Sequence, residues 1–243
     1  MEIKSLKDKK MCRDEFLRIL LYGPAGAGKT TLAASFPKPF LFNFDDKLKS
    51  IYGLDVDYVD YSSLNPKEMD KNWQRFWKDF SKMKSDTEYS TFIFDGLTIM
   101  DRMLLARCNV LAGKGAGDKA TLPVYGEQAT TYKHLFMEMN AIKNKNIILT
   151  GHHLEVRDDG AGKDGHLLEI TPLITGKKIR PILPAMFEEV YYLERIGGEK
   201  DLRRMHYRPY KKANANSTIL RGKEGKLDNP TYETIIEQAI KES

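Results

Sequence analysis

One segment of the chain carries every fixed position of the phosphate-binding pattern G-x-x-x-x-G-K-[ST]. Its residues are Gly23, Pro24, Ala25, Gly26, Ala27, Gly28, Lys29 and Thr30, and Thr31 follows directly. In such a loop the glycines let backbone N–H groups surround phosphate oxygens, the lysine reaches the β- and γ-phosphates, and the threonine hydroxyl binds Mg²⁺. We therefore predict that this segment, with Thr31, binds a nucleoside triphosphate.

The sequence on either side of the loop supports that prediction. Residues 16–22 form an apolar stretch typical of a buried strand, and residues 31–36 are compatible with a helical turn. Strand, loop and helix in this order are the context in which the pattern binds phosphate. A chance glycine-rich turn between a strand and a helix is the alternative interpretation.

A second feature is the acid at the end of the apolar stretch of residues 91–95. Asp95 follows three apolar residues and precedes Gly96. An acid at such a strand end, downstream of a phosphate-binding loop, is typical of the Walker B residue that holds Mg²⁺ beside the loop hydroxyl, here that of Thr30. An ordinary turn residue before a glycine is the alternative. We predict the Mg²⁺ role.

Hydrolysis also needs a group that orients or deprotonates the attacking water. Asp45 and Asp46 follow the apolar stretch of residues 39–44, and His152 follows that of residues 146–151. The carboxyl ends of parallel strands face the ligand, so either aspartate is a candidate for positioning the water. His152 is a candidate for contacting the γ-phosphate or the water. A turn pair and a purely structural histidine remain the alternatives.

Strands and helices alternate along the first two thirds of the chain. The predicted strands are residues 16–22, 39–44, 91–95 and 146–151, and the predicted helices are residues 66–84, 97–112 and 126–143. This alternation predicts an α/β fold with a mainly parallel central sheet and helices on both faces. Trp73, Phe76, Trp77 and Phe80 share one face of the first of these helices. A base-stacking platform is one reading of this stripe, but core packing is the usual one and is our prediction.

The alternation of strands and helices ends after residue 153. In an extended chain His153 should point away from His152. Residues 154–157 and 166–170 flank a glycine-rich turn and predict a protruding hairpin. Further antiparallel strands are predicted at residues 189–193 and 203–208, and a last helix at residues 230–240. We expect residues 1–15 to form a flexible basic arm and residues 16–243 to form a single domain.

Composition excludes several classes of protein. The chain has 243 residues, with 39 basic and 34 acidic side chains and a net charge of +5, a mild basicity that permits a polyanionic partner without requiring one. No apolar run is long enough to span a bilayer, and residues 1–5 lack the apolar core of a signal peptide. Cys12 and Cys108 lack metal-ligand spacing and suit a reducing cytosol. We expect a cytoplasmic protein with no membrane partner.

The motifs in this order resemble the RecA-like P-loop ATPase core, and more narrowly the phage Sak-type single-strand annealing and recombination proteins. The resemblance covers roughly residues 16–225 and rests on the phosphate-binding loop, Asp45-Asp46, Asp95 and His152 with the residues before each. It implies a RecA-like P-loop NTPase fold with antiparallel strands toward the C-terminus. It also implies hydrolysis of ATP to ADP and phosphate with Mg²⁺. The family's usual catalytic acid is glutamate, and the shorter aspartate here implies slow or DNA-stimulated turnover. His152 takes the place of the family's polar sensor.

The resemblance also implies partners. RecA-like cores bind single-stranded DNA through two mobile loops, which correspond to residues 113–124 and 154–178. The cations in or beside them are Lys114, Lys119, Arg157, Lys163, Lys177, Lys178 and Arg180. Such cations suit backbone phosphates, although solubilising loop charges are the alternative. The family assembles as a homo-oligomer, a ring or a filament, with basic groups reaching across the subunit boundary. Lys211 and Lys212 lie where those fingers are expected.

The sequence therefore predicts an ATP-dependent, single-stranded-DNA-binding protein of phage-type recombination, with a single-strand-binding protein as a possible partner. Two other functions remain open. One is a small-molecule kinase, although the hairpin carries Arg157 where such a kinase needs a lid with several arginines. The other is a nucleotide switch that acts on a protein partner.

Overall fold

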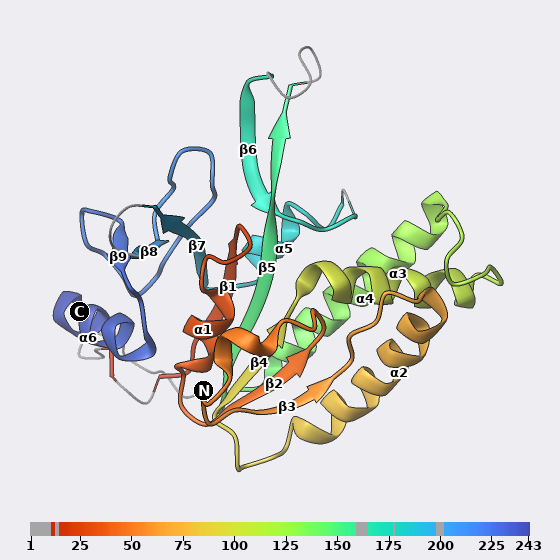
Figure 1. Cartoon of the computed structure of the whole chain (residues 1–243), viewed down its shortest axis with the longest axis horizontal. Coiled ribbons are helices and arrows are strands. Elements are labelled where there is room, and N and C mark those ends of the chain that lie inside the picture. Colours follow the sequence, from red (N-terminus) through yellow and green to blue (C-terminus); the bar gives the residue numbers. More distant parts are fainter. Residues whose placement is uncertain (1–10, 13–14, 159–164, 177, 198–201) are drawn as a thin grey trace, which may run out of the picture.

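The computed structural model describes residues 11–12, 15–158, 165–176, 178–197 and 202–243 (Figure 1). The strands are β1 (Arg18–Gly23), β2 (Pro39–Asn43), β3 (Asp57–Asp60), β4 (Thr91–Asp95), β5 (Asn146–Arg157), β6 (Leu167–Pro172), β7 (Glu189–Ile196), β8 (Leu202–His206) and β9 (Lys226–Asp228). The helices are α1 (Lys29–Ala34), the 3-10 turn η1 (Leu48–Ile51), α2 (Pro66–Met83), α3 (Leu97–Leu111), α4 (Leu122–Ala141), α5 (Ile182–Ala185) and α6 (Tyr232–Glu242).

These strands form one sheet in the order β3-β2-β4-β5-β1-β7-β8-β9, and β6 pairs with β5. The pairs from β3 to β7 are parallel, whereas β8 and β9 continue the sheet antiparallel. The sheet confirms the predicted α/β fold with a mainly parallel centre and antiparallel strands toward the C-terminus. Parallel order places the carboxyl ends of β1, β2, β4 and β5 along one edge.

Each face of the sheet is covered by helices, as Figure 1 shows. Leu20 and Tyr22 of β1 join the core that includes residues of α2, α3 and α4, while Ile19 and Leu21 join a second core with residues of α1 and α6. Alternate residues of a strand point to opposite faces, so a strand buried on both faces is apolar throughout. This explains the continuous apolar runs of the sequence.

Helix α2 begins where the sequence predicts. The Asn65 side chain accepts a hydrogen bond from the Lys67 backbone N–H at 3.0 Å, and Pro66 occupies the first helical position. Its aromatic stripe packs into the core, where Phe76 is fully buried between rings such as Phe42 and Phe94. The prediction of a core stripe is therefore confirmed.

Some boundaries differ from those predicted. Helix α4 begins at Leu122 rather than residue 126, because Thr121 and Pro123 form its first turn. Strand β5 does not end at residue 151 but runs unbroken to Arg157, where it pairs with β6 as the predicted hairpin. Strand β3 was not predicted, since its residues are few, mostly exposed and bounded by aspartates at both ends.

Two expectations concern parts of the chain that lie mostly outside the described residues. The predicted arm over residues 1–15 and the turn between β5 and β6 both fall largely there. Among the helices that the structure describes, none is apolar over a length that would cross a membrane.

We predict that Phe76→Ala lowers the free energy of unfolding by about 3–5 kcal/mol, because it leaves a cavity among aromatic rings that cannot close around it. Denaturant unfolding followed by circular dichroism measures this change. Met137→Ala, on a side chain that is 64% exposed, is the control and should cost little. Equal loss in the two variants would contradict the core assignment.

Candidate nucleotide-binding site

The phosphate-binding loop connects the end of β1 to the start of α1 and depends on glycine for its path. A Cβ atom at Gly23 would lie 2.0 Å from the Leu193 carbonyl oxygen on the neighbouring strand β7. Gly28 has φ of 88°, in the left-handed region that other residues rarely adopt. The two glycines at fixed positions of the pattern are thus required by the shape of the loop as well as by its chemistry.

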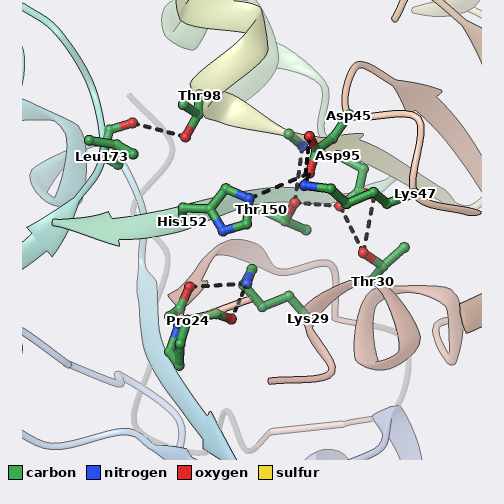
Figure 2. A network of polar contacts seen from close by, with 12 residues as sticks. Pro24, Lys29, Thr30, Asp45, Lys47, Asp95, Thr98, Thr150, His152 and Leu173 are labelled. Carbon is green, nitrogen blue, oxygen red and sulfur yellow. Dashed lines mark hydrogen bonds and ion pairs between the residues drawn. The ribbon is translucent and has the colours of Figure 1, made fainter. Parts of the chain in front are cut away.

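Lys29 points back over this loop (Figure 2). Its Nζ donates hydrogen bonds to the carbonyl oxygens of Gly23 at 3.0 Å and Pro24 at 2.8 Å. The side chain is nearly buried, and this burial lowers the pKa of Lys29 to about 8. The loop therefore holds a cation whose own partners are neutral carbonyls, an arrangement that an anionic ligand would stabilise.

Asp95 ends β4 beside the loop and is 4% exposed. Thr30 Oγ1 lies 3.1 Å from both carboxylate oxygens, and Thr150 Oγ1 donates to Oδ1 at 2.5 Å. Burial raises the pKa of Asp95, while the hydrogen bonds from the two hydroxyls act to lower it. A carboxylate and a hydroxyl held together in this way are hard oxygen ligands of the kind that Mg²⁺ prefers. The residues present therefore fit a magnesium ion.

Asp45 and Asp46, which the sequence left equivalent, differ in the structure. Asp45 Oδ2 lies 3.4 Å from His152 Nε2 and 2.9 Å from Lys47 Nζ (Figure 2). Burial acts to raise the pKa of Asp45, but the hydrogen bonds from His152 and Lys47 outweigh it and hold this pKa below its ordinary value. Asp46 is exposed, with φ of 47°. The geometry thus favours Asp45 as the acid that works with His152.

The neighbouring residue His153 lies on the other side of β5, as the alternation of a strand predicts. Its Nδ1 is 3.2 Å from the hydroxyl of Tyr192 on β7. His152 and His153 therefore have different surroundings, and His152 is the one that lies beside Asp45.

These groups line one cavity of about 490 Å³. Lys29, Thr30, Asp45, Asp95 and His152 all contribute to its wall, together with Thr31 and Asp46. Segments that are up to 123 residues apart (Lys29 to His152) meet here because β1, β2, β4 and β5 end at the same edge. Such a convergence of charged groups at the carboxyl ends of parallel strands is the usual position of a ligand site.

The wall also includes Arg203, a residue that sequence reasoning missed. Arg203 lies on β8, far along the chain from the loop, and no motif marks it. The pairing of β8 with β7, and of β7 with β1, carries it to the site. A strand predicted at residues 203–208 was visible in the sequence, but its neighbours in the sheet were not.

The first predicted DNA-binding segment, residues 113–124, begins as a turn that hydrogen bonds close. Asn109 Nδ2 donates to the carbonyl oxygens of Ala116 at 3.4 Å and Asp118 at 2.8 Å, and Lys114 Nζ donates to the Lys119 carbonyl oxygen at 2.8 Å. Residues 122–124, the end of this segment, belong to helix α4. In Figure 1 the α3–α4 connection lies well away from the hairpin.

The second predicted segment contains the hairpin and the chain after it. Arg157 Nη2 lies 2.6 Å from Glu155 Oε2, so this cation has a partner within its own strand. Lys178 is exposed, whereas Arg180 is half-buried and its Nη2 lies 3.4 Å from the Ile174 carbonyl oxygen. Lys163 and Lys177 lie outside the described residues.

The predicted finger residues lie on the connection between β8 and β9. Lys211 Nζ is 3.9 Å from Glu194 Oε2 and 4.8 Å from the centre of the Tyr210 ring. Lys212 is exposed. Neither residue lines the cavity at the phosphate-binding loop of its own chain.

Comparison of the sequence with models of known protein families agrees with this geometry. The chain matches a family model described as an AAA domain over residues 15–218, a range that contains the loop, Asp45, Asp95, His152 and the hairpin. A search of curated proteins found no match. The matched range spans most of the 243 residues. The chain therefore belongs to the AAA domain family, which indicates a P-loop domain of the nucleotide-binding ATPase type.

Proposed function

We propose that the chain hydrolyses ATP to ADP and phosphate with Mg²⁺ and couples this reaction to the binding of single-stranded DNA in phage-type recombination or strand annealing. One observation carries the proposal, the unbroken course of β5. This strand passes Asp95 at Thr150 and Asp45 at His152, and then continues to Arg157 in the hairpin with β6. Figure 1 shows the hairpin projecting from the body of the protein.

The nucleotide part of the proposal follows from the cavity. Lys29 would bind the β- and γ-phosphates, and Thr30 with Asp95 would hold Mg²⁺, which neutralises charge on the phosphates when bound. Asp45 would orient the attacking water and accept its proton, as an ionised carboxylate can. His152 and Lys47 hold the pKa of Asp45 low, which makes this carboxylate a weak base. A weakly basic carboxylate accepts a proton reluctantly, so we expect slow turnover.

The DNA part rests on contacts that join the site to the chain after β6. Leu173 donates its backbone N–H to the His152 carbonyl oxygen at 2.8 Å, and Thr98 Oγ1 donates to the Leu173 carbonyl oxygen at 3.2 Å. Thr98 lies in the first turn of α3, and this helix begins directly after Asp95 and Gly96. A shift of His152 or α3 on nucleotide binding would therefore move the segment that leads to Lys178. We propose that this segment and the hairpin contact DNA.

The proposal includes assembly as a ring or filament, a single-strand-binding protein as a further partner and action in the host cytoplasm. A kinase is less favoured, because such an enzyme needs a lid with several arginines and the described part of the hairpin carries one, Arg157. A nucleotide switch with a protein partner is the outcome to prefer if DNA neither binds nor changes the ATPase rate.

Lys29→Ala should abolish ATP hydrolysis and greatly weaken ATP binding, because it removes the cation at the phosphates. Steady-state phosphate release and binding of a fluorescent ATP analogue measure the two effects. Lys133→Ala, which removes an exposed lysine on α4, is the control and should behave like the parent. Full activity in Lys29→Ala would refute the phosphate-binding role.

Asp95→Asn should raise the Mg²⁺ concentration needed for half-maximal hydrolysis, or prevent recovery altogether, because it removes a formal charge at the metal position. The readout is the ATPase rate across a Mg²⁺ titration. The control Asp55→Asn changes an exposed aspartate outside the cavity. An unchanged Mg²⁺ profile in Asp95→Asn would exclude the residue from the metal site.

Single-stranded DNA should stimulate hydrolysis and bind with a steep salt dependence. The double variant Arg157→Ala/Lys178→Ala should flatten the slope of log affinity against log salt by about 1.4, since each phosphate neutralised on a single strand contributes about 0.7. Fluorescence anisotropy measures this slope, and the DNA-free ATPase rate should stay intact. Lys114→Ala/Lys119→Ala tests the α3–α4 turn in the same way.

The matched control for both double variants is Lys82→Ala/Lys133→Ala, which removes two exposed lysines from α2 and α4. If all three variants keep the slope and affinity of the parent, neither predicted segment binds DNA. Absence of both DNA binding and DNA stimulation in the parent would favour the protein-partnered switch.

A further inference from the structure

Arg203 lies against the phosphate-binding loop although it belongs to β8, a strand from the C-terminal part of the chain. A Cβ atom built on Gly28 would lie 2.7 Å from Arg203 Cδ and 2.9 Å from its Nη1. The same side chain lines the cavity that contains Lys29 and Asp95. It also lines an adjoining hollow of about 340 Å³ at the start of α6, bounded by Thr31 and Asn229 among others. A guanidinium thus lies where the loop's backbone would meet a ligand.

The backbone at Arg203 is fixed by two hydrogen bonds to one residue. Its N–H donates to Asn229 Oδ1 at 3.1 Å, and its carbonyl oxygen accepts from the Asn229 N–H at 2.6 Å. Asn229 has φ of 46°, a left-handed conformation that asparagine tolerates better than most residues but that still costs free energy. Such a conformation persists where the surrounding structure requires it, and the two hydrogen bonds that Asn229 makes hold the Arg203 backbone in place.

Arg203 and the next residue along β8, Arg204, differ in their ion-pair partners. Arg204 forms an ion pair with Asp228, with Nε 2.6 Å from Oδ1. Among the residues that the structure describes, no carboxylate lies within ion-pair distance of the Arg203 guanidinium. Adjacent arginines on one strand point to opposite faces, so one is paired on its own face while the other faces the nucleotide cavity. An anion in that cavity would complete the surroundings of Arg203.

We propose that Arg203 is a nucleotide-binding residue that contacts the phosphates of ATP bound in the same chain. The assignment rests on the nucleotide binding proposed above. Asp95 approaches the loop from β4, beyond β5, whereas Arg203 approaches it from β8, beyond β7. The phosphates would then lie between the metal position and a guanidinium that can donate two parallel hydrogen bonds to phosphate oxygens.

The proposal separates Arg203 from the predicted fingers Lys211 and Lys212, which would act on the nucleotide of a neighbouring subunit. Arg203 needs no second subunit, because its own chain brings it to Gly28. A single chain would therefore bind the triphosphate through Arg203 before the subunits assemble.

The test compares Arg203→Ala, Arg203→Lys and the control Arg204→Ala in the full chain without DNA. Binding of an N-methylanthraniloyl derivative of ATP is followed by fluorescence, with unlabelled ATP, ADP and adenosine as competitors. Arg203→Ala should weaken ATP and ADP binding by about tenfold or more, since hydrogen bonds to a charged group are among the stronger ones. Adenosine competition should stay unchanged, and Arg203→Lys should recover part of the loss. Thermal unfolding without nucleotide checks that each variant is folded.

A mixing experiment distinguishes the two ways in which the residue could act. Combining Arg203→Ala with Lys29→Ala should give no ATPase activity above the sum of the separate samples, because no site in the mixture then has both residues from one chain. Recovery of activity would show that Arg203 acts on a neighbour and would overturn the assignment.

The remaining outcomes separate this inference from the proposed function. If Arg203→Ala binds ATP as tightly as the parent and Arg204→Ala, while Lys29→Ala binds weakly, the Arg203 assignment is wrong and the nucleotide site stands. If the parent itself fails to bind ATP, both proposals are wrong.

Discussion

The buried carboxylate of Asp95 is the contact on which the site depends. A carboxylate that is 4% exposed is costly unless hydrogen bonds replace water, and here the hydroxyls of Thr30 and Thr150 supply them. Thr150 Oγ1 also accepts the Gly96 N–H at 3.1 Å. One side chain thereby joins the phosphate-binding loop, the end of β4 and the middle of β5. Satisfying this carboxylate requires these three segments to meet at one point.

From the phosphate-binding loop, which follows β1, the sheet continues in two directions, through β5 and through β7. On one side β5 leads through His152 into the hairpin with β6, so groups that contact Asp45 and Asp95 are continuous with the projecting part of the chain. On the other side β7 packs against Gly23, and β8 brings Arg203 over Gly28. The loop thus lies between the strand that continues into the hairpin and the strands that come from the C-terminal part of the chain. This asymmetry is what the proposed function requires, since one part must hold ATP while another part reports its presence.

Contiguous motifs and apolar runs were enough to predict the phosphate-binding loop, the strand before Asp95 and helix α2 with its core stripe, because each depends on residues close together in sequence. The features of the site that the sequence did not predict depend on the register between distant strands. Nothing local distinguishes Asp45 from Asp46, since the difference is a contact with His152 on another strand. Arg203 was not predicted for the same reason, since the pairing of β8 with β7 brings it to the loop. The glycines and lysines of the segment after α3 likewise do not reveal that Asn109, in the preceding helix, donates a hydrogen bond to the Asp118 carbonyl oxygen.

The most direct test of the central claim, that this edge of the sheet is an ATP site built around Asp95, is isothermal titration calorimetry of the unmodified protein with ATP in the presence and absence of Mg²⁺. We expect saturable binding of one ATP per chain, with an affinity that increases when Mg²⁺ is added, because the metal position formed by Thr30 and Asp95 is then filled. If ATP shows no saturable binding with Mg²⁺ present, this edge of the sheet is not an ATP site.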